Sequence, residues 1–125
     1  MAKKAVLAIG VDPAFADLSA FPGLNPELVR QYVEAEIERL SALGFDVVSR
    51  LVDPGGGAEE VIAAALRSRR FDCVLIGAGL REPPALLFLF ERIVNFVHEL
   101  APNTRIAFNA RPADSAEAVG RWIDP

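Results

Sequence analysis

Short apolar runs alternate with longer helical patterns along the whole chain. The first run (5–11) and the third (71–77) are almost continuously apolar, which is typical of strands covered on both faces. The second (45–52) alternates more and should lie nearer an edge, and a fourth covers 105–109. Because a helical pattern follows each run, we expect right-handed crossovers. The sequence therefore predicts one α/β domain over residues 1–125, a Rossmann-like three-layer sandwich with a four-stranded parallel sheet in the order 2-1-3-4.

Capping and turn residues mark the ends of the predicted first helix. Asn25 can cap it, Pro26 suits its first turn, and Gly44 suits its end. The spacing of apolar residues predicts a buried stripe. That stripe consists of Val29, Val33, Ile37 and Leu40.

Three further helices are expected along the chain. The second covers about 58–70 and the third 83–100, while the last begins at Asp114, which has capping-box spacing with Glu117. The residues expected to face the core are Val61, Ile62, Ala65 and Leu66 in the second helix and Ala118, Val119, Trp122 and Ile123 in the last.

This order of elements resembles the flavodoxin-like group of α/β folds, to which response-regulator receivers also belong. The resemblance is one of topology and covers the full length. The phrases IGAGLREPP, LFERIVNFVHELAP and FNARP are also similar to a set of small uncharacterised bacterial proteins, which implies no activity. A receiver would need a phosphoacceptor aspartate where this chain has 77–79, and a later lysine, but no lysine follows Lys4. The segment DPAFADLSAF is not the Ser/Thr-rich phosphate loop of a flavodoxin.

Composition narrows the class of protein further. Hydrophobic residues make up 52% of the chain, which argues against disorder, and the net charge of −4 argues against broad binding to a nucleic-acid backbone. Cys73 is the only cysteine and lies in an apolar run, where a small buried residue is expected. Neither a signal peptide nor a membrane-spanning run is recognisable. We therefore expect a soluble, cytoplasmic protein without a membrane partner.

The predicted topology fixes the edge at which a ligand would bind. Ligands of open parallel sheets bind outside the carboxyl ends of the strands, where the strand order reverses. With the order 2-1-3-4 this point lies between the first and third strands. The candidate residues there are Asp12, Gly77, Ala78, Gly79, Arg81, Asn109 and Arg111.

The Gly77-Ala78-Gly79 motif is not expected to be a dinucleotide loop. That fingerprint follows the first strand and needs a third glycine, whereas this motif follows the third strand and has Glu82 at the sixth position. Either it is a plain glycine turn, or it is a ligand loop of another kind in which Arg81 holds a phosphate or carboxylate. The second possibility predicts binding of a small anionic ligand, a nucleotide or phosphate ester.

Two acidic residues suggest an alternative function. Asp12 and Asp17 could help to bind Mg²⁺ or Mn²⁺, with Asp12 as the catalytic metal ligand of a hydrolase, including a nuclease acting on nucleic acid. A local role for Asp12, capping a turn opened by Pro13, competes with this interpretation. The connection 11–25 is unusually long and could be a lid over the crevice or a plug of the sheet end.

An exposed aromatic residue supports a third possibility. Phe88 falls on the polar side of the third predicted helix, and Leu87 lies at its border. An apolar pair on a polar face predicts an interaction surface, here that of a homodimer. His98, the only histidine, lies at the far end of the same helix, so no catalytic role is expected for it.

Overall fold

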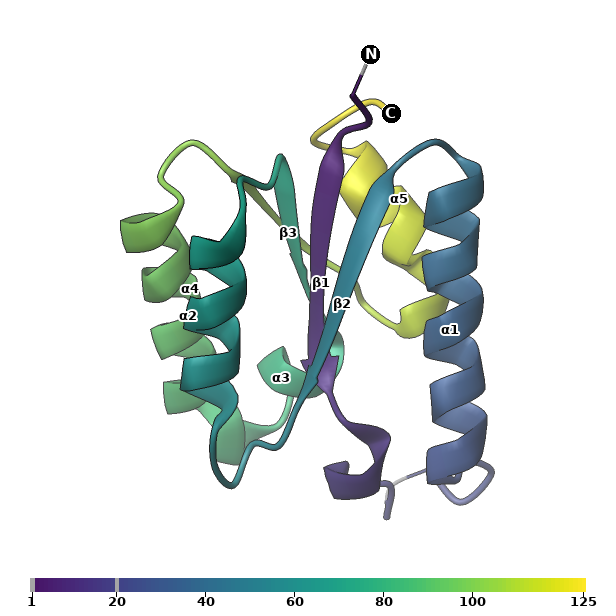
Figure 1. The fold of residues 1–125 in the computed structure, drawn as a ribbon. Helices are drawn as coiled ribbons and strands as arrows, with labels where there is room; N and C mark the ends of the chain where they lie inside the picture. Colours follow the sequence, from purple (N-terminus) through teal and green to yellow (C-terminus); the bar gives the residue numbers. More distant parts are fainter. Residues whose placement is uncertain (1, 20) are drawn as a thin grey trace.

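The computed structural model describes residues 2–19 and 21–125 and contains one parallel sheet (Figure 1). Its strands are β1 (Ala5–Val11), β2 (Asp46–Val52), β3 (Cys73–Ile76) and β4 (Arg105–Phe108). They lie in the order β2-β1-β3-β4, so the predicted topology is confirmed. Ile9 pairs with Ile76, and Ile76 pairs with Phe108, so that these three strands end at nearly the same level. The carboxyl ends therefore form one edge.

Helices cover both faces of this sheet, as expected for a three-layer sandwich. Figure 1 shows α1 (Pro26–Ala42) and α5 (Ser115–Gly120) on one face and α2 (Ala58–Ser68) and α4 (Leu87–Leu100) on the other. A short helix, α3 (Ala78–Arg81), lies at the carboxyl edge. The connections contain single 3₁₀ turns at Pro13–Phe15, Pro84–Leu86 and Pro112–Asp114.

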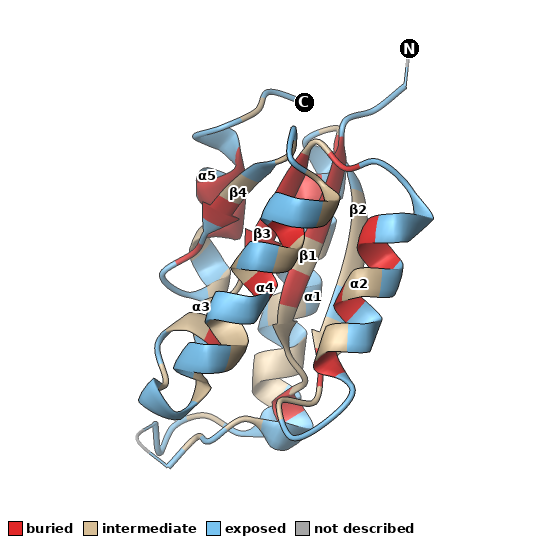
Figure 2. Cartoon of the chain, turned by 90° about the vertical axis from the view of Figure 1, so that its left-hand side faces the viewer, coloured by how far each residue is buried: buried red, intermediate tan, exposed pale blue. Residues whose placement is uncertain are grey.

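The core consists of two apolar clusters, one on each face of the sheet. Neighbouring strand residues alternate between them, so that Leu7 and Val74 pack with α2 and α4 while Val6 and Leu75 pack on the other side. All four residues of β3 are buried, and Figure 2 shows the buried positions gathered along the strands and the inner sides of the helices. The continuous apolar pattern of β1 and β3 thus reflects burial on both faces.

Local sequence signals fix the ends of α1. The Asn25 side chain accepts a hydrogen bond from the Leu28 N–H at 2.8 Å, and Pro26 occupies the first helical position. Gly44 has a φ of +109°, a conformation that side-chain-bearing residues rarely adopt. The predicted cap, first turn and end of this helix are confirmed.

The predicted third helix is wrong at its start. The chain forms α3 over 78–81 and a 3₁₀ turn before α4 begins at Leu87, rather than one helix from Pro83. Pro83 and Pro84 both lack an N–H group, and a proline disfavours helical backbone at the residue before it. The two prolines therefore separate a short helix from a long one.

Three smaller expectations also fail. Val61 lies at the margin of the α2 stripe and is 38% exposed, while Trp122 follows the end of α5 and is 51% exposed. Asp114 does not cap α5 with its side chain, because its carboxylate turns back to accept the N–H groups of Ala110 and Arg111. The capping box predicted with Glu117 is therefore absent from this helix start.

Candidate functional site

The glycine motif brings α3 down over the end of β1. The Gly77 N–H donates to the Ile9 carbonyl oxygen at 2.9 Å, and a Cβ atom at Gly77 would lie 3.4 Å from that oxygen. At Gly79 a Cβ would lie 3.7 Å from the Val11 side chain. Leu80 is fully buried in the core on the α2 and α4 face. The chain after β3 therefore packs against the sheet end.

Asn109 joins the ends of β3 and β4. Its side chain is buried and accepts the Ala78 N–H at 2.8 Å through Oδ1. Its Nδ2 donates to Ser115 Oγ at 3.0 Å, and that hydroxyl donates to the Pro112 carbonyl at 2.7 Å. The start of α3, the end of β4 and the start of α5 are thus held by one side chain, and the first N–H of α3 already has an acceptor.

Arg81 is held by the same strand end. Its Nη2 donates to the Asn109 carbonyl at 2.9 Å and lies 3.6 Å from a Glu82 carboxylate oxygen. About a third of the side chain is exposed, at 32%. The Nε atom, however, is buried and has no hydrogen-bond partner among the described residues. The guanidinium is thus positioned at the carboxyl edge, and its Nε donor is unused.

Asp12 also lies at this edge, where it forms its own hydrogen bonds. Its Oδ1 accepts the Ala14 N–H and the Arg30 Nη2, both at 3.0 Å, while its backbone N–H donates to Val52. The Ala14 hydrogen bond, together with Arg30, holds the pKa of Asp12 below its ordinary value. The structure thus shows the turn-capping role and adds an ion pair.

Asp17 also takes part in a local turn. Its Oδ1 accepts the Ser19 N–H at 3.0 Å, and hydrogen bonds from Ser19 lower its pKa. Over residues 2–19 and 21–125, no three His, Cys, Asp or Glu side chains gather in an arrangement that could hold a metal ion. A Mg²⁺ or Mn²⁺ site at Asp12 and Asp17 stays a prediction.

The 11–25 connection combines a buried start with exposed aromatics. Pro13 is fully buried, whereas Phe15 and Phe21 are about half exposed. The 3₁₀ turn at Pro13–Phe15 packs against α1. Ala20 lies outside the described residues.

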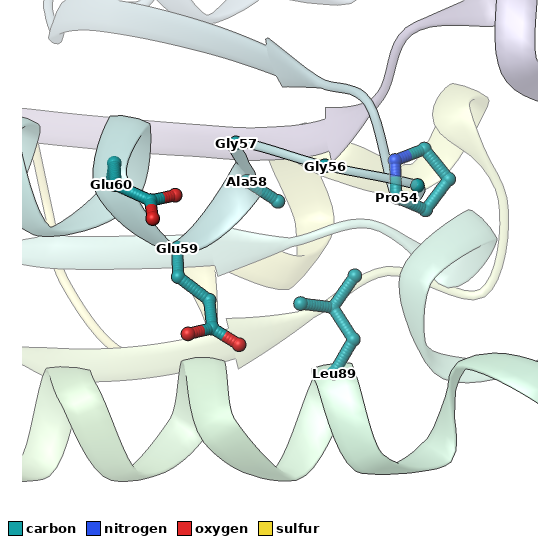
Figure 3. A pocket seen from close by; sticks show the side chains of 8 residues that line it. Pro54, Gly56, Gly57, Ala58, Glu59, Glu60 and Leu89 are labelled. Carbon is teal, nitrogen blue, oxygen red and sulfur yellow. The ribbon is translucent and has the colours of Figure 1, made fainter.

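A pocket lies at the carboxyl edge beside β2. It has a volume of about 250 Å³ and is lined by residues 54–60 and Leu89 (Figure 3). Gly57 directly precedes α2, has a φ of +80° and offers no side-chain cap. Asp53 accepts the Gly55 N–H at 2.8 Å. Glu59 forms an ion pair with Arg92 of α4 at 2.7 Å. The two glutamates at 59 and 60 place negative charge at this helix start.

The remaining candidates are exposed. Arg111 lies on the surface just after β4, and Leu87 and Phe88 at the start of α4 are 54% and 75% exposed. His98 is exposed in the last turn of α4, at the opposite end from Leu87, as the sequence predicted.

Sequence reasoning missed Arg30 and Ser115. Arg30 pairs with an aspartate 18 residues away, and Ser115 was overlooked beside the expected cap at Asp114. Neither contact has a local sequence signal, because each depends on two elements meeting in the folded chain.

Comparisons with known proteins do not identify a family for this chain. No protein-family model and no curated protein matches the sequence. A crystal structure of a fragment from Peptoclostridium difficile 630, provisionally named a lipoprotein, is similar at 14% identity with a TM-score of 0.48, over 94% of this chain and 92% of that one. In the part of this chain that is described, no helix has the length and apolar character needed to cross a bilayer.

Proposed function

We propose that the chain binds a small anionic ligand, a nucleotide or phosphate ester, at the carboxyl edge of the sheet through Arg81. The observation that supports this is the Arg81 side chain, which is 32% exposed at this edge and whose buried Nε lacks an acceptor among the described residues. A buried donor without a partner is costly and asks for an explanation such as a ligand oxygen. Among buried side-chain nitrogen and oxygen atoms in the described part of the chain, this is the one without a partner.

The surroundings of Arg81 suit an anion. Its guanidinium is anchored by the Asn109 carbonyl, so little conformational freedom is lost when a ligand binds. Gly79 is exposed and has no side chain to block approach to the α3 backbone. Arg111 is exposed two residues beyond Asn109 and can supply a second positive charge. Arginine suits phosphate because its donors form a planar fork.

The Nε–H of Arg81 provides a direct test. We would titrate inorganic phosphate, AMP and ATP while recording the arginine Nε–H signals by ¹H–¹⁵N NMR. Binding should move the Arg81 signal and raise the melting temperature, and Arg81→Lys should reduce that rise because lysine has no equivalent donor.

Arg121→Lys is the matched control. Arg121 Nη2 donates to the carbonyl of Phe108, the residue before Asn109, at 2.9 Å, so this variant tests loss of a similar arginine anchor while Arg81 is kept. An unmoved Arg81 signal with all three probes, or equal loss in both variants, would contradict the proposal.

A second candidate function is self-association through Leu87 and Phe88. At 75% exposure, Phe88 leaves most of a large apolar side chain in water at the beginning of α4. A symmetric dimer would bury these groups in a self-complementary contact.

Analytical ultracentrifugation tests this second candidate. Phe88→Asp should convert a dimer into a monomer without unfolding, because aspartate is favourable in the first turn of a helix. Phe21→Asp, at a residue 55% exposed in the 11–25 connection, is the control and should leave the mass unchanged. A wild-type protein that is monomeric at high concentration would rule out the dimer.

A further inference from the structure

A groove lies at the amino edge of the sheet, opposite the site described above. It has a volume of about 410 Å³ and runs between the turn after α2 and the turn after α4. These helices lie side by side on one face, and both end at the edge where the chain termini lie (Figure 1). Small-molecule sites commonly have volumes in the range of 300–1,000 Å³, so the groove is large enough for a ligand of modest size.

The lining of the groove is positively charged. It contains Arg67, Arg69 and Arg70 and no acidic residue. Arg69 already has partners within the chain, because its guanidinium forms an ion pair with Asp46 at 3.0 Å and lies 5.5 Å from the centre of the Phe71 ring. Arg67 and Arg70 form no ion pair in the part of the chain that is described, so two positive charges remain uncompensated.

The dipole of α2 offsets only part of this positive charge. The last turn of α2 carries a partial negative charge, which Arg67 offsets. Arg70 lies beyond that helix, in the turn that leads into β3, and no carboxylate faces it from the groove lining. The whole chain has a net charge of −4, whereas the lining of this groove is positively charged.

The rest of the lining is apolar with a polar rim. Leu66 and Phe71 are almost fully buried at its base, and Leu100 of α4 lies on its other side. Asn103 is exposed at the rim. Such a surface suits a molecule that has both an anionic group and a flat or apolar part, since arginine binds phosphate through its fork and the base excludes water.

We propose that this groove binds a phosphorylated small molecule of about nucleotide size, with its phosphate on Arg67 and Arg70 and its apolar part over Leu66 and Leu100. The site is independent of Arg81, because the two lie at opposite edges of the sheet. Lys3, Lys4 and Arg105 are also exposed at the amino edge and would add to the attraction of an anion.

Backbone ¹H–¹⁵N NMR titrations test the groove with inorganic phosphate, AMP and adenosine as probes. AMP should shift the amide signals of residues 67–71, 101, 103 and 104, phosphate should do so more weakly, and adenosine should not bind. Because each charge-assisted hydrogen bond is worth about tenfold in affinity, Arg67→Gln with Arg70→Gln should weaken the AMP binding detected at these amides by about a hundredfold or abolish it. Arg50→Gln with Arg92→Gln removes the same charge elsewhere and should leave it unchanged.

Several results would overturn the assignment. One is the absence of amide shifts in 67–71, 101, 103 and 104 at about 10 mM AMP or phosphate. A site that stays empty at that concentration would bind too weakly to be useful. Another is adenosine binding as well as AMP, which would leave the arginines without a role. An affinity that rises steadily with oligonucleotide length would instead define a polyanion surface. Shifts confined to 77–81 and 109–111 would support the Arg81 site and contradict this one.

Discussion

Replacing Asn109 with alanine should weaken the whole carboxyl edge, because one buried side chain serves two elements there. The substitution removes the acceptor for the Ala78 N–H at 2.8 Å and the donor to Ser115 Oγ at 3.0 Å. The Arg81 bond to the backbone carbonyl of residue 109 is retained, so the effect reports on the amide group itself.

The expected loss of stability follows from these two bonds. A neutral hydrogen bond contributes about 1 kcal/mol net, so two bonds give about 2 kcal/mol. Water can reach Ala78, which is only partly buried, and Ser115 keeps its bond to Pro112, so neither group is left fully without partners. For a chain of 125 residues the entropy of unfolding is about 260 cal/mol/K, so 2 kcal/mol lowers the melting temperature by about 8 °C.

Urea unfolding followed by circular dichroism measures this loss. Asn109→Asp keeps an acceptor for Ala78 but buries a carboxylate against Ser115 Oγ, so it should be no more stable than Asn109→Ala. A double-mutant cycle with Ser115→Ala should give a coupling of about 1 kcal/mol. An Asn109→Ala protein within about 0.5 kcal/mol of wild type, or a coupling near zero, would refute the assigned role.

Three other residues, Gly79, Gly57 and Cys73, provide further tests of the structure. Gly79→Ala should leave the melting temperature unchanged or slightly higher, since its Cβ would meet Val11 at an ordinary 3.7 Å, and a lower melting temperature would contradict this packing. Gly57→Ala should cost about 1 kcal/mol in urea unfolding because φ is +80°, and an unchanged midpoint would count against that conformation. Burial raises the pKa of the Cys73 thiol to about 12, so at pH 8 a disulfide reagent should react much more slowly with folded than with urea-unfolded protein. Since the folded pKa is the higher one, the stability from this thiol is complete below pH 9 and is lost as pH rises toward 12, which an alkaline unfolding series of wild type and Cys73→Ala would show.

The sheet was predictable because its signals are local and repeated. Each strand appears as an apolar run, and the near-continuous runs at 5–11 and 71–77 place β1 and β3 in the centre. The start of α1 was equally clear, since Asn25 and Pro26 act within one turn. These features depend on residues only a few positions apart, so the sequence pattern contains them directly.

The short helix α3 was not predictable in the same way. Its first N–H finds an acceptor in Asn109, which lies 31 residues further along the chain. A Gly-Ala-Gly segment has weak helix propensity, so this turn forms through tertiary contacts of that asparagine and of the buried Leu80. Sequence periodicity has no means of showing a cap supplied from another strand.

The same distinction applies to the candidate site residues. Topology correctly placed Arg81 and Asn109 at one edge, because both follow strands that end at the same level. It gave no information on whether their polar groups would be free, since that depends on side-chain contacts. The Ala78 N–H, which an anion could have used, already bonds to Asn109.

The contacts of Arg81 and Asp12 favour the anion proposal over a metal at Asp12. The Arg30 guanidinium and the Ala14 N–H both bond to Oδ1 of Asp12 at 3.0 Å, so a cation would have to bind at Oδ2, beside the positive charge of Arg30. An anion at Arg81 would share the guanidinium with the Glu82 carboxylate, which lies 3.6 Å from Nη2. Only Nη2 of that guanidinium is engaged by hydrogen bonding within the described residues, and its Nε has no partner. An anionic oxygen would therefore be attracted to donors of Arg81 that form no hydrogen bond, whereas a metal at Asp12 would be repelled by Arg30.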